Sequence, residues 1–151
     1  MSVISQKLSD LGITLASPGA PAAAYVMAVT SGHQVFLSGH IAKRDGKPWV
    51  GKLGVDMDTA TGQMAARSIA IDLLSTLNAH LGSLDRVRRI VKVMGLVNSS
   101  SEFTEQHLVM NGCSELIVEV FGEIGKHARS AFGVAQIPLG ACVEIEMIVE
   151  I

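Results

Sequence analysis

Residues 127–151 read HARSAFGVAQIPLGACVEIEMIVEI, and this stretch carries the clearest fold signal in the chain. In its second half, apolar and acidic residues alternate with a period of two, which is typical of a β-strand with one covered face. The apolar face comprises Val143, Ile145, Met147, Val149 and Ile151, and the acidic face comprises Glu144, Glu146 and Glu150. We interpret Ser130–Ile137 and Ala141–Ile151 as a β-hairpin that turns at Pro138-Leu139-Gly140.

Two helices are expected upstream of this hairpin. Thr59–Leu81 repeats apolar residues at spacings of three and four, and Gly82 supplies a C-terminal stop. A second helix is expected over Gln106–Phe121. The loop before it contains Ser99 three residues ahead of Glu102, which is the spacing of a capping box.

The remaining elements are a short helix and three strands. Val3–Leu11 has the pattern of a short amphipathic helix. Tyr25–Thr30 and Gln34–Ser38 flank Ser31-Gly32 and predict a first hairpin. Val87–Val97 predicts a strand that is apolar on both faces, so we expect one face to take helices and the other a second subunit or more sheet. Helices that return to one face of a mixed sheet give a two-layer α+β domain.

Composition favours a single folded domain in the cytoplasm. The chain has 151 residues, of which 48% are hydrophobic and 17% charged, which suits one domain and argues against disorder. The apolar runs are much shorter than the roughly 20 residues of a membrane span, and the start of the chain does not resemble a signal peptide. Cys113 and Cys142 are expected to be reduced and buried.

Several classes of function are disfavoured. The net charge is −2, and the one basic cluster (Arg86, Arg88, Arg89 and Lys92) lies in or beside the predicted strand, so nucleic acid is an unlikely partner. The five histidines have neither metal-ligand spacing nor an obvious acidic partner, and no metal site is predicted. Phosphate-loop, nucleophile-elbow and catalytic-triad patterns are not found. The expected chemistry therefore needs no metal, nucleotide or conventional nucleophile.

A few polar residues at element ends remain as candidates. Arg129 stands at the start of a strand, where it can hold a carboxylate by two parallel hydrogen bonds or form an ordinary salt bridge. Glu144 fits a surface carboxylate or a catalytic one, Tyr25 a core residue or a site residue, and Asn111 an exposed or a functional position. Without any family resemblance, the sequence therefore predicts an oligomeric α+β domain in which Arg129 is a candidate anion site.

The same residues resemble a known family. Segment 127–146, with Ala128-Arg129-Ser130 and Val143-Glu144-Ile145-Glu146, is similar to the C-terminal signature of the Rid family of reactive intermediate deaminases. Segments 25–29 and 38–41 resemble the first hairpin of that family, and Met110-Asn111-Gly112 resembles its second-helix motif. The closest likeness is to a divergent, YjgF-like subgroup that is often labelled endoribonuclease L-PSP.

The resemblance implies a chorismate-mutase-like fold, a homotrimer and sites in clefts between subunits. Archetypal members hydrolyse 2-imino and enamine acids to 2-keto acids and ammonia without a cofactor. By this likeness Arg129 would hold the substrate carboxylate, and Glu144 would position the attacking water or stabilise the cationic nitrogen. The other cleft residues would be Tyr25, Ser38, Gly39, Asn111 and Ala131.

The chain also departs from the family pattern. Ala131 stands where many members have cysteine, Ala23-Ala24 replaces Gly-Pro, and residues 1–20 form an N-terminal extension to the single domain 1–151. In the predicted hairpin, Glu144 and Arg129 lie roughly 20 Å apart, so we expect them to meet only between two subunits. Alternative functions are a non-catalytic protein that senses small carboxylates and, less favoured, an endoribonuclease or translation inhibitor.

Overall fold

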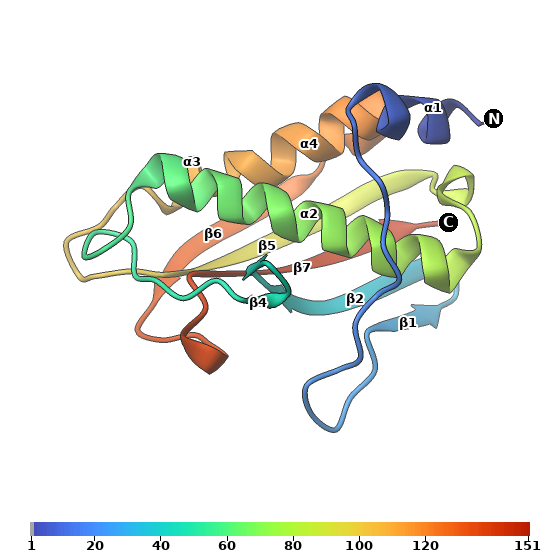
Figure 1. Cartoon of the computed structure of the whole chain (residues 1–151). Helices are drawn as coiled ribbons and strands as arrows, with labels where there is room; N and C mark the ends of the chain where they lie inside the picture. The colour runs from blue at the N-terminus through green and yellow to red at the C-terminus, as the bar shows by residue number, and fades with distance from the viewer. Residues whose placement is uncertain (1) are drawn as a thin grey trace.

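A mixed five-stranded sheet forms one layer of the molecule, and helices form the other (Figure 1). The computed structural model describes residues 2–151. The helices are α1 (Val3–Asp10), α2 (Thr59–Leu81), α3 (Gln106–Val109) and α4 (Asn111–Phe121), with short 3-10 turns at Leu84–Arg86, Gly122–Gly125 and Pro138–Gly140. The strands are β1 (Ala28–Ser31), β2 (Gln34–Ile41), β3 (Lys43–Arg44), β4 (Lys47–Pro48), β5 (Arg89–Asn98), β6 (Ala128–Val134) and β7 (Val143–Glu150). The predicted two-layer α+β arrangement, with the two main helices on one face, is confirmed.

The order of strands in the main sheet is β1-β2-β7-β5-β6, and β3 and β4 form a separate two-stranded ribbon. All neighbouring pairs of the main sheet are antiparallel except β5 and β6, which are parallel. The parallel pair is linked by a crossover through α3 and α4, as parallel strands require.

Helix α2 has the bounds that the sequence predicts. The Asp58 side chain accepts a hydrogen bond from the Thr61 backbone N–H at 2.8 Å and caps the N-terminus. Gly82 ends the helix in the left-handed conformation, with φ of 80°, which glycine adopts without a side-chain clash. No helix within the described part of the chain, α2 included, is long and apolar enough to cross a membrane.

The predicted second helix is wrong in one respect, because it is interrupted at Met110 and divides into α3 and α4. Met110 is fully buried against Gly95 of β5, where any larger residue would collide with its side chain. The expected capping box is also not formed. The Ser99 hydroxyl donates to the Val97 carbonyl, and the Glu102 carboxylate accepts from Ser101.

The first hairpin is present but shifted along the chain. Its strands are β1 and β2, the turn is Gly32-His33, and Tyr25 lies before the first strand. A register shift between Leu37 and His40 marks a bulge in β2. The predicted short helix and central strand match α1 and β5 to within two residues at each end.

The predicted C-terminal hairpin is wrong. β6 and β7 are not neighbours, because β6 pairs with one edge of β5 and β7 with the other. The turn at Pro138–Gly140 instead carries the chain past the end of β5. The two predicted strands overlap β6 and β7, with ends that differ by up to three residues. The pattern within a strand is the same whichever strand becomes its neighbour, so it did not reveal the pairing.

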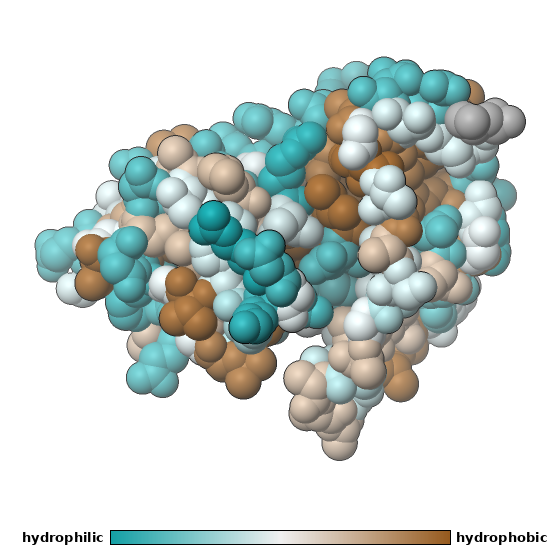
Figure 2. All heavy atoms as spheres, viewed as in Figure 1, coloured by the Kyte–Doolittle hydropathy of each residue, from teal (hydrophilic) through white to brown (hydrophobic). Residues whose placement is uncertain are grey.

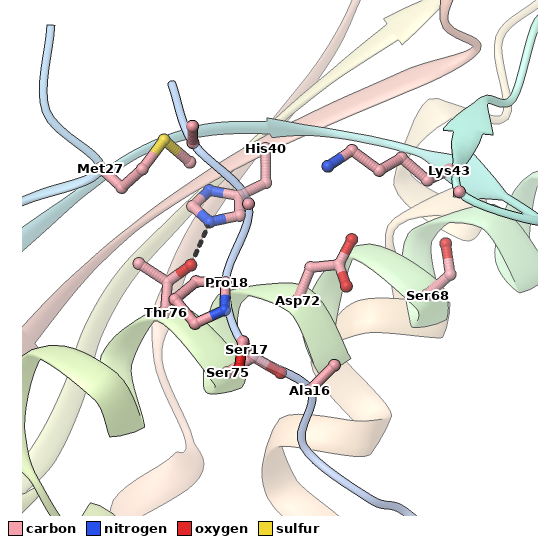
Figure 3. A pocket seen from close by; sticks show the side chains of 13 residues that line it. Ala16, Ser17, Pro18, Met27, His40, Lys43, Ser68, Asp72, Ser75 and Thr76 are labelled. Atoms are coloured by element: carbon pink, nitrogen blue, oxygen red, sulfur yellow. Dashed lines mark hydrogen bonds between the residues drawn. The ribbon is translucent and has the colours of Figure 1, made fainter. Parts of the chain in front are cut away.

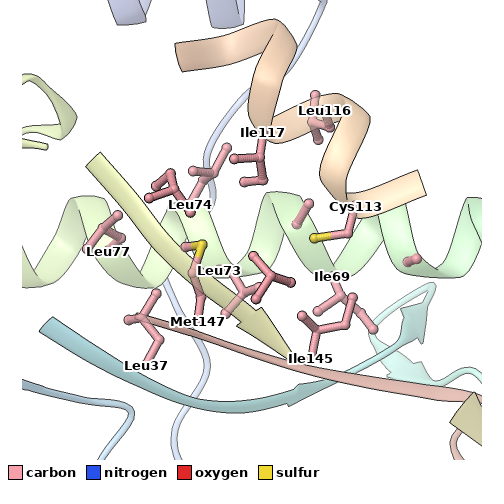
Figure 4. Close-up of a cluster of buried hydrophobic side chains, with 14 of the residues drawn as sticks. Leu37, Ile69, Leu73, Leu74, Leu77, Cys113, Leu116, Ile117, Ile145 and Met147 are labelled. Atoms are coloured by element: carbon pink, nitrogen blue, oxygen red, sulfur yellow. The ribbon is translucent and has the colours of Figure 1, made fainter. Parts of the chain in front are cut away.

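The core lies between the helices and the covered face of the sheet. Figure 4 shows α2 side chains such as Leu73 and Leu77 packing toward Ile145 and Met147 of β7, with Ile117 of α4 above them. All five side chains have at most 2% exposure. The apolar face of β7 therefore binds the helical layer, as the alternation predicts.

The opposite face of the sheet has no covering layer in the single chain. Phe36 lies opposite Ile148, and Leu96 lies between Glu144 and Phe132. Phe36 and Phe132 are 42% and 45% exposed. This open face thus combines large apolar side chains with a row of carboxylates.

Candidate functional site

Arg129 is the second residue of β6, at the edge of the sheet. It is in register with the buried Val93 of β5, so its side chain lies on the face that the helices cover. One terminal nitrogen, Nη1, donates to Asn111 Oδ1 at 2.9 Å and to Ser114 Oγ at 3.2 Å. The other, Nη2, donates to the His107 carbonyl at 2.9 Å. Helices α3 and α4 therefore fix the position of the guanidinium.

All three oxygens that hold Arg129 are neutral. Among residues 2–151, the ion pairs are Arg67 with Glu119 and Lys126 with Glu123, and neither involves Arg129. A guanidinium has five N–H donors, so Nε and one N–H of Nη2 remain for another acceptor. Two parallel N–H donors are the arrangement that a carboxylate accepts. The ordinary salt bridge considered for Arg129 is thus not formed within residues 2–151, and the group can receive an anion.

A second row of hydrogen bonds supports Arg129. His127 Nδ1 lies 2.6 Å from the Gly125 carbonyl and must donate to it, which leaves Nε2 as an acceptor. Nε2 lies 2.9 Å from the Ser114 hydroxyl, which can donate to it while accepting from Arg129. Burial lowers the pKa of His127, and the charge of Arg129 lowers it further. The imidazole is therefore neutral near pH 7 and orients the Ser114 oxygen toward the guanidinium.

Two glycines bring the helices close enough for these bonds. Gly112, beside Asn111, lies directly against the Gln63 carbonyl of α2, where a side chain has no room. Gly95 of β5 accommodates Met110 at the break between α3 and α4. Ala131 is in register with Gly95, two residues after Arg129 on the same face of β6. The structure thus brings together three of the predicted site residues, namely Asn111, Arg129 and Ala131.

The other predicted residues form a second group around the bulge of β2. The Ser38 hydroxyl donates to the Val26 carbonyl at 2.6 Å, and this bond ties the bulge to the segment that carries Tyr25. Glu144 of β7 lies over Gly39, and its carboxylate occupies the space that a side chain at position 39 would take. Burial raises the pKa of Glu144, and the nearby Glu146 raises it further. Tyr25 is 43% exposed beside this group, so it is not a core residue.

The two groups do not meet within one chain. Glu144 and Phe132 are both in register with Leu96, so Arg129 is two strands and three residues away from Glu144. At about 4.8 Å per strand and 3.3 Å per residue, their Cα atoms are roughly 14 Å apart. Their side chains also point to opposite faces, because Glu144 alternates with buried residues of β7. The distance of roughly 20 Å that was derived from the predicted hairpin is therefore wrong. The conclusion that Arg129 and Glu144 are too far apart to meet within one chain still holds.

Sequence reasoning missed the residues that hold Arg129 in place. Ser114 and His127 are 13 residues apart and match no recognisable spacing, yet they are hydrogen-bonded. The neighbouring Cys113 and the more distant Cys142 are free and buried, and burial raises the pKa values of their thiols to about 12 and about 11. Neither is activated as a nucleophile. Within residues 2–151, no group of three or more His, Cys, Asp or Glu side chains is placed to hold a metal ion.

Comparison with known proteins gives the family. Residues 5–151 match the model described as "YjgF/chorismate_mutase-like, putative endoribonuclease". The chain belongs to the YjgF family. It is 49% identical over 150 residues to Protein TCP17 of Trypanosoma cruzi. The aligned region covers 98% of this chain and 94% of that protein.

Two solved structures illustrate the similarity. A protein of unknown function from Agrobacterium tumefaciens is 44% identical, with a TM-score of 0.91, and covers 99% of this chain and 92% of its own. RidA from the Antarctic bacterium Psychrobacter is 26% identical, with a TM-score of 0.60, and covers 91% of this chain and 96% of its own. The chorismate-mutase-like fold expected from the resemblance is therefore confirmed.

Proposed function

We propose that this YjgF-family chain hydrolyses reactive 2-imino and enamine acids to 2-keto acids and ammonia. The observation that carries the proposal is Arg129, a partly buried guanidinium that neutral oxygens hold and that forms no ion pair within residues 2–151. Such a group is ready to bind the carboxylate that every substrate of this class contains. The similarity to a protein named RidA supports the same reaction class.

The reaction needs positioning more than a strong catalyst. In a protonated imine the carbon is already electrophilic, so water adds to it, and ammonia leaves as the carbonyl forms. Arg129 would fix the carboxylate. Glu144 would accept a proton from the attacking water and return it to the nitrogen of the resulting carbinolamine, so that the C–N bond breaks and ammonia leaves as the hydroxyl loses its proton to form the carbonyl. Its raised pKa makes Glu144 a better base than an ordinary surface carboxylate. Orientation in such a site is worth several powers of ten in rate.

A complete site would combine two subunits of a homotrimer. Arg129, Asn111 and Ala131 would come from one subunit, and Glu144 with the Tyr25, Ser38 and Gly39 group would come from its neighbour. The separation of the two groups within one chain supports this arrangement. The exposed apolar residues of the open face, including Phe36 and Phe132, supply a surface of the kind that subunits bury on assembly.

The first test measures the decay of 2-iminopropanoate generated in situ by an amino-acid oxidase. Wild type should accelerate decay, and Arg129→Ala should abolish the acceleration. Arg67→Ala is the matched control, because Arg67 forms an exposed ion pair on α2 instead. If no imino acid decays faster with wild type, hydrolysis is refuted. Arg129-dependent binding of 2-keto acids would then assign the site to a carboxylate sensor.

A second test asks whether the site is shared between chains. Arg129→Ala and Glu144→Gln should each retain at most about a tenth of wild-type activity. Trimers refolded from an equal mixture should regain about a quarter of wild-type activity, because about one interface in four then pairs two intact groups. A mixture that stays inactive, although analytical ultracentrifugation shows mixed trimers, would place both groups in a site within one chain.

A further inference from the structure

A cavity of about 370 Å³ lies on the helical side of the molecule, away from Arg129. Residues 16–20 cross in front of α2 and form one wall, while polar residues of α2 and the ends of β2 and β3 form the others. The segment is made of small, weakly polar residues, visible as pale spheres that run down the face shown in Figure 2. The cavity is open to solvent and is large enough for a small metabolite.

The wall formed by α2 offers hydrogen-bond acceptors. Ser68, Asp72 and Ser75 are spaced at four and three residues and line the cavity from one side of the helix (Figure 3). The two serine hydroxyls already donate to backbone carbonyls of the helix, Ala65 at 2.7 Å and Ile71 at 2.9 Å, so toward a ligand their oxygens can act only as acceptors. Within residues 2–151, the half-buried Asp72 carboxylate forms neither an ion pair nor a side-chain hydrogen bond.

The opposite side of the cavity carries one cation. The Lys43 side chain extends along the cavity, and its ammonium lies close to the N-terminal segment at Gly19 (Figure 3). No ion pair joins Lys43 to Asp72, although both line the same space. Two opposite charges therefore face one cavity without forming an ion pair.

His40 contributes no charge to this cavity. Its Nδ1 donates to the Ser38 carbonyl at 2.7 Å, and its Nε2 accepts from the Thr76 hydroxyl at 2.8 Å. Burial lowers the pKa of His40, which keeps the ring neutral near pH 7. Burial also raises the pKa of Asp72, against the opposing field of the Lys43 ammonium. Burial thus makes it costly to keep the Asp72 carboxylate ionised, and a bound cation would offset that cost.

We propose that this cavity binds a free amino acid. Its ammonium group has three N–H donors, which match the Asp72 carboxylate and the Ser68 and Ser75 oxygens. Its carboxylate would pair with Lys43, and its side chain would contact Met27 and the residues of the N-terminal segment. Arg129 is not part of this site, because β6 and β2 lie three strands apart in the sheet.

Isothermal titration with wild type tests the proposal, using glycine, L-alanine, L-serine and 4-aminobutyrate, with methylamine and acetate as single-charge controls. At least one amino acid should bind at least tenfold more tightly than either control. Asp72→Asn and Lys43→Met should each weaken that binding at least tenfold, as the loss of a charge-assisted hydrogen bond does. Arg129→Ala is the matched control and should bind the amino acid as wild type does.

Three results would overturn the proposal. The first is no binding of any of these amino acids with a Kd of about 1 mM or tighter. The second is binding that acetate or methylamine reproduces. The third is binding that is lost in Arg129→Ala but retained in Lys43→Met. Lys43 is exposed, so its replacement leaves the fold intact and keeps the test valid even if Asp72→Asn unfolds.

Discussion

Replacement of Gly112 by alanine tests how the helical layer holds Arg129. Gly112 is the second residue of α4, and it packs against the backbone of α2. A Cβ atom at this position would overlap the Gln63 carbonyl oxygen and lie 2.7 Å from its carbon and 3.0 Å from its Cα. These are backbone atoms of a long helix, so they cannot rotate aside, and α4 must move away from α2.

The sign of the effect separates this explanation from simple helix propensity. Alanine stabilises a helix interior by about 1 kcal/mol relative to glycine. Forcing extra volume into a packed contact costs about 1–3 kcal/mol, and sometimes more where the neighbours are rigid. We expect the contact to outweigh propensity, so that Gly112→Ala lowers the free energy of unfolding by about 2 kcal/mol. For a chain of this size that corresponds to a Tm lower by about 4–8 °C.

Gly62→Ala is the matched control for this experiment. Gly62 is also helical, but its new Cβ would meet only side-chain methyl groups, those of Leu53 at 2.9 Å and Val109 at 3.0–3.2 Å. These can shift, so its stability should stay within about 1 kcal/mol of wild type. Urea unfolding at a single protein concentration measures all three proteins. If Gly112→Ala were as stable as wild type or more so, the close contact between α2 and α4 would be refuted.

Three further predictions concern the polar groups of the site. Ser114→Ala removes one acceptor of Arg129 and the donor to His127, so urea unfolding should show a loss of about 1–2 kcal/mol, whereas an unchanged midpoint would contradict the shared hydroxyl. The lowered pKa of His127 means that the unfolded chain takes up this proton first as pH falls below about 6.5, so stability should decline there, and His127→Gln should reduce the decline in urea titrations at successive pH values. Because burial and Glu146 raise the pKa of Glu144, the unfolded chain releases this proton more readily than the folded chain does, so the ionised carboxylate lowers the stability of the fold at pH 7. Glu144→Gln should therefore raise Tm slightly while it lowers the acceleration of imine decay at least about tenfold, and a lower Tm would contradict the assigned cause.

The elements of the fold were largely predictable, because local patterns determine them. The spacing of apolar residues with Gly82 gives the bounds of α2, and the strict alternation in β7 identifies its buried face. The pairing of β6 was not predictable in this way. Its neighbour is set by the crossover from β5 through α3 and α4, and the alternation within a strand contains no information about that path. The break at Met110 likewise depends on Gly95, a residue of another element.

The site was predictable in its individual residues rather than as an arrangement. Arg129 and Asn111 stand out by type and by family resemblance, and the structure joins them by a hydrogen bond. Their support by Ser114 and His127 depends on tertiary contacts that no spacing reveals. The nearness of Asp72 to His40 was likewise not predictable, because 32 residues separate them in the chain. Asp72 raises the pKa of His40 slightly, against the larger effect of burial, and forms no ion pair with it within residues 2–151.

The unneutralised charges mark the two places where we propose that ligands bind. A partly buried guanidinium without a counter-ion disfavours folding, and so does a half-buried carboxylate without a donor. A fold selected for stability alone would pair such groups, yet Arg129 is surrounded by neutral oxygens, and Asp72 and Lys43 face each other across a cavity without pairing. Any ligand that supplies the missing charge binds the folded state alone and stabilises it in proportion to the logarithm of its concentration. The two places therefore differ in what they should take: an anion at Arg129, and a molecule with both charges beneath the N-terminal segment.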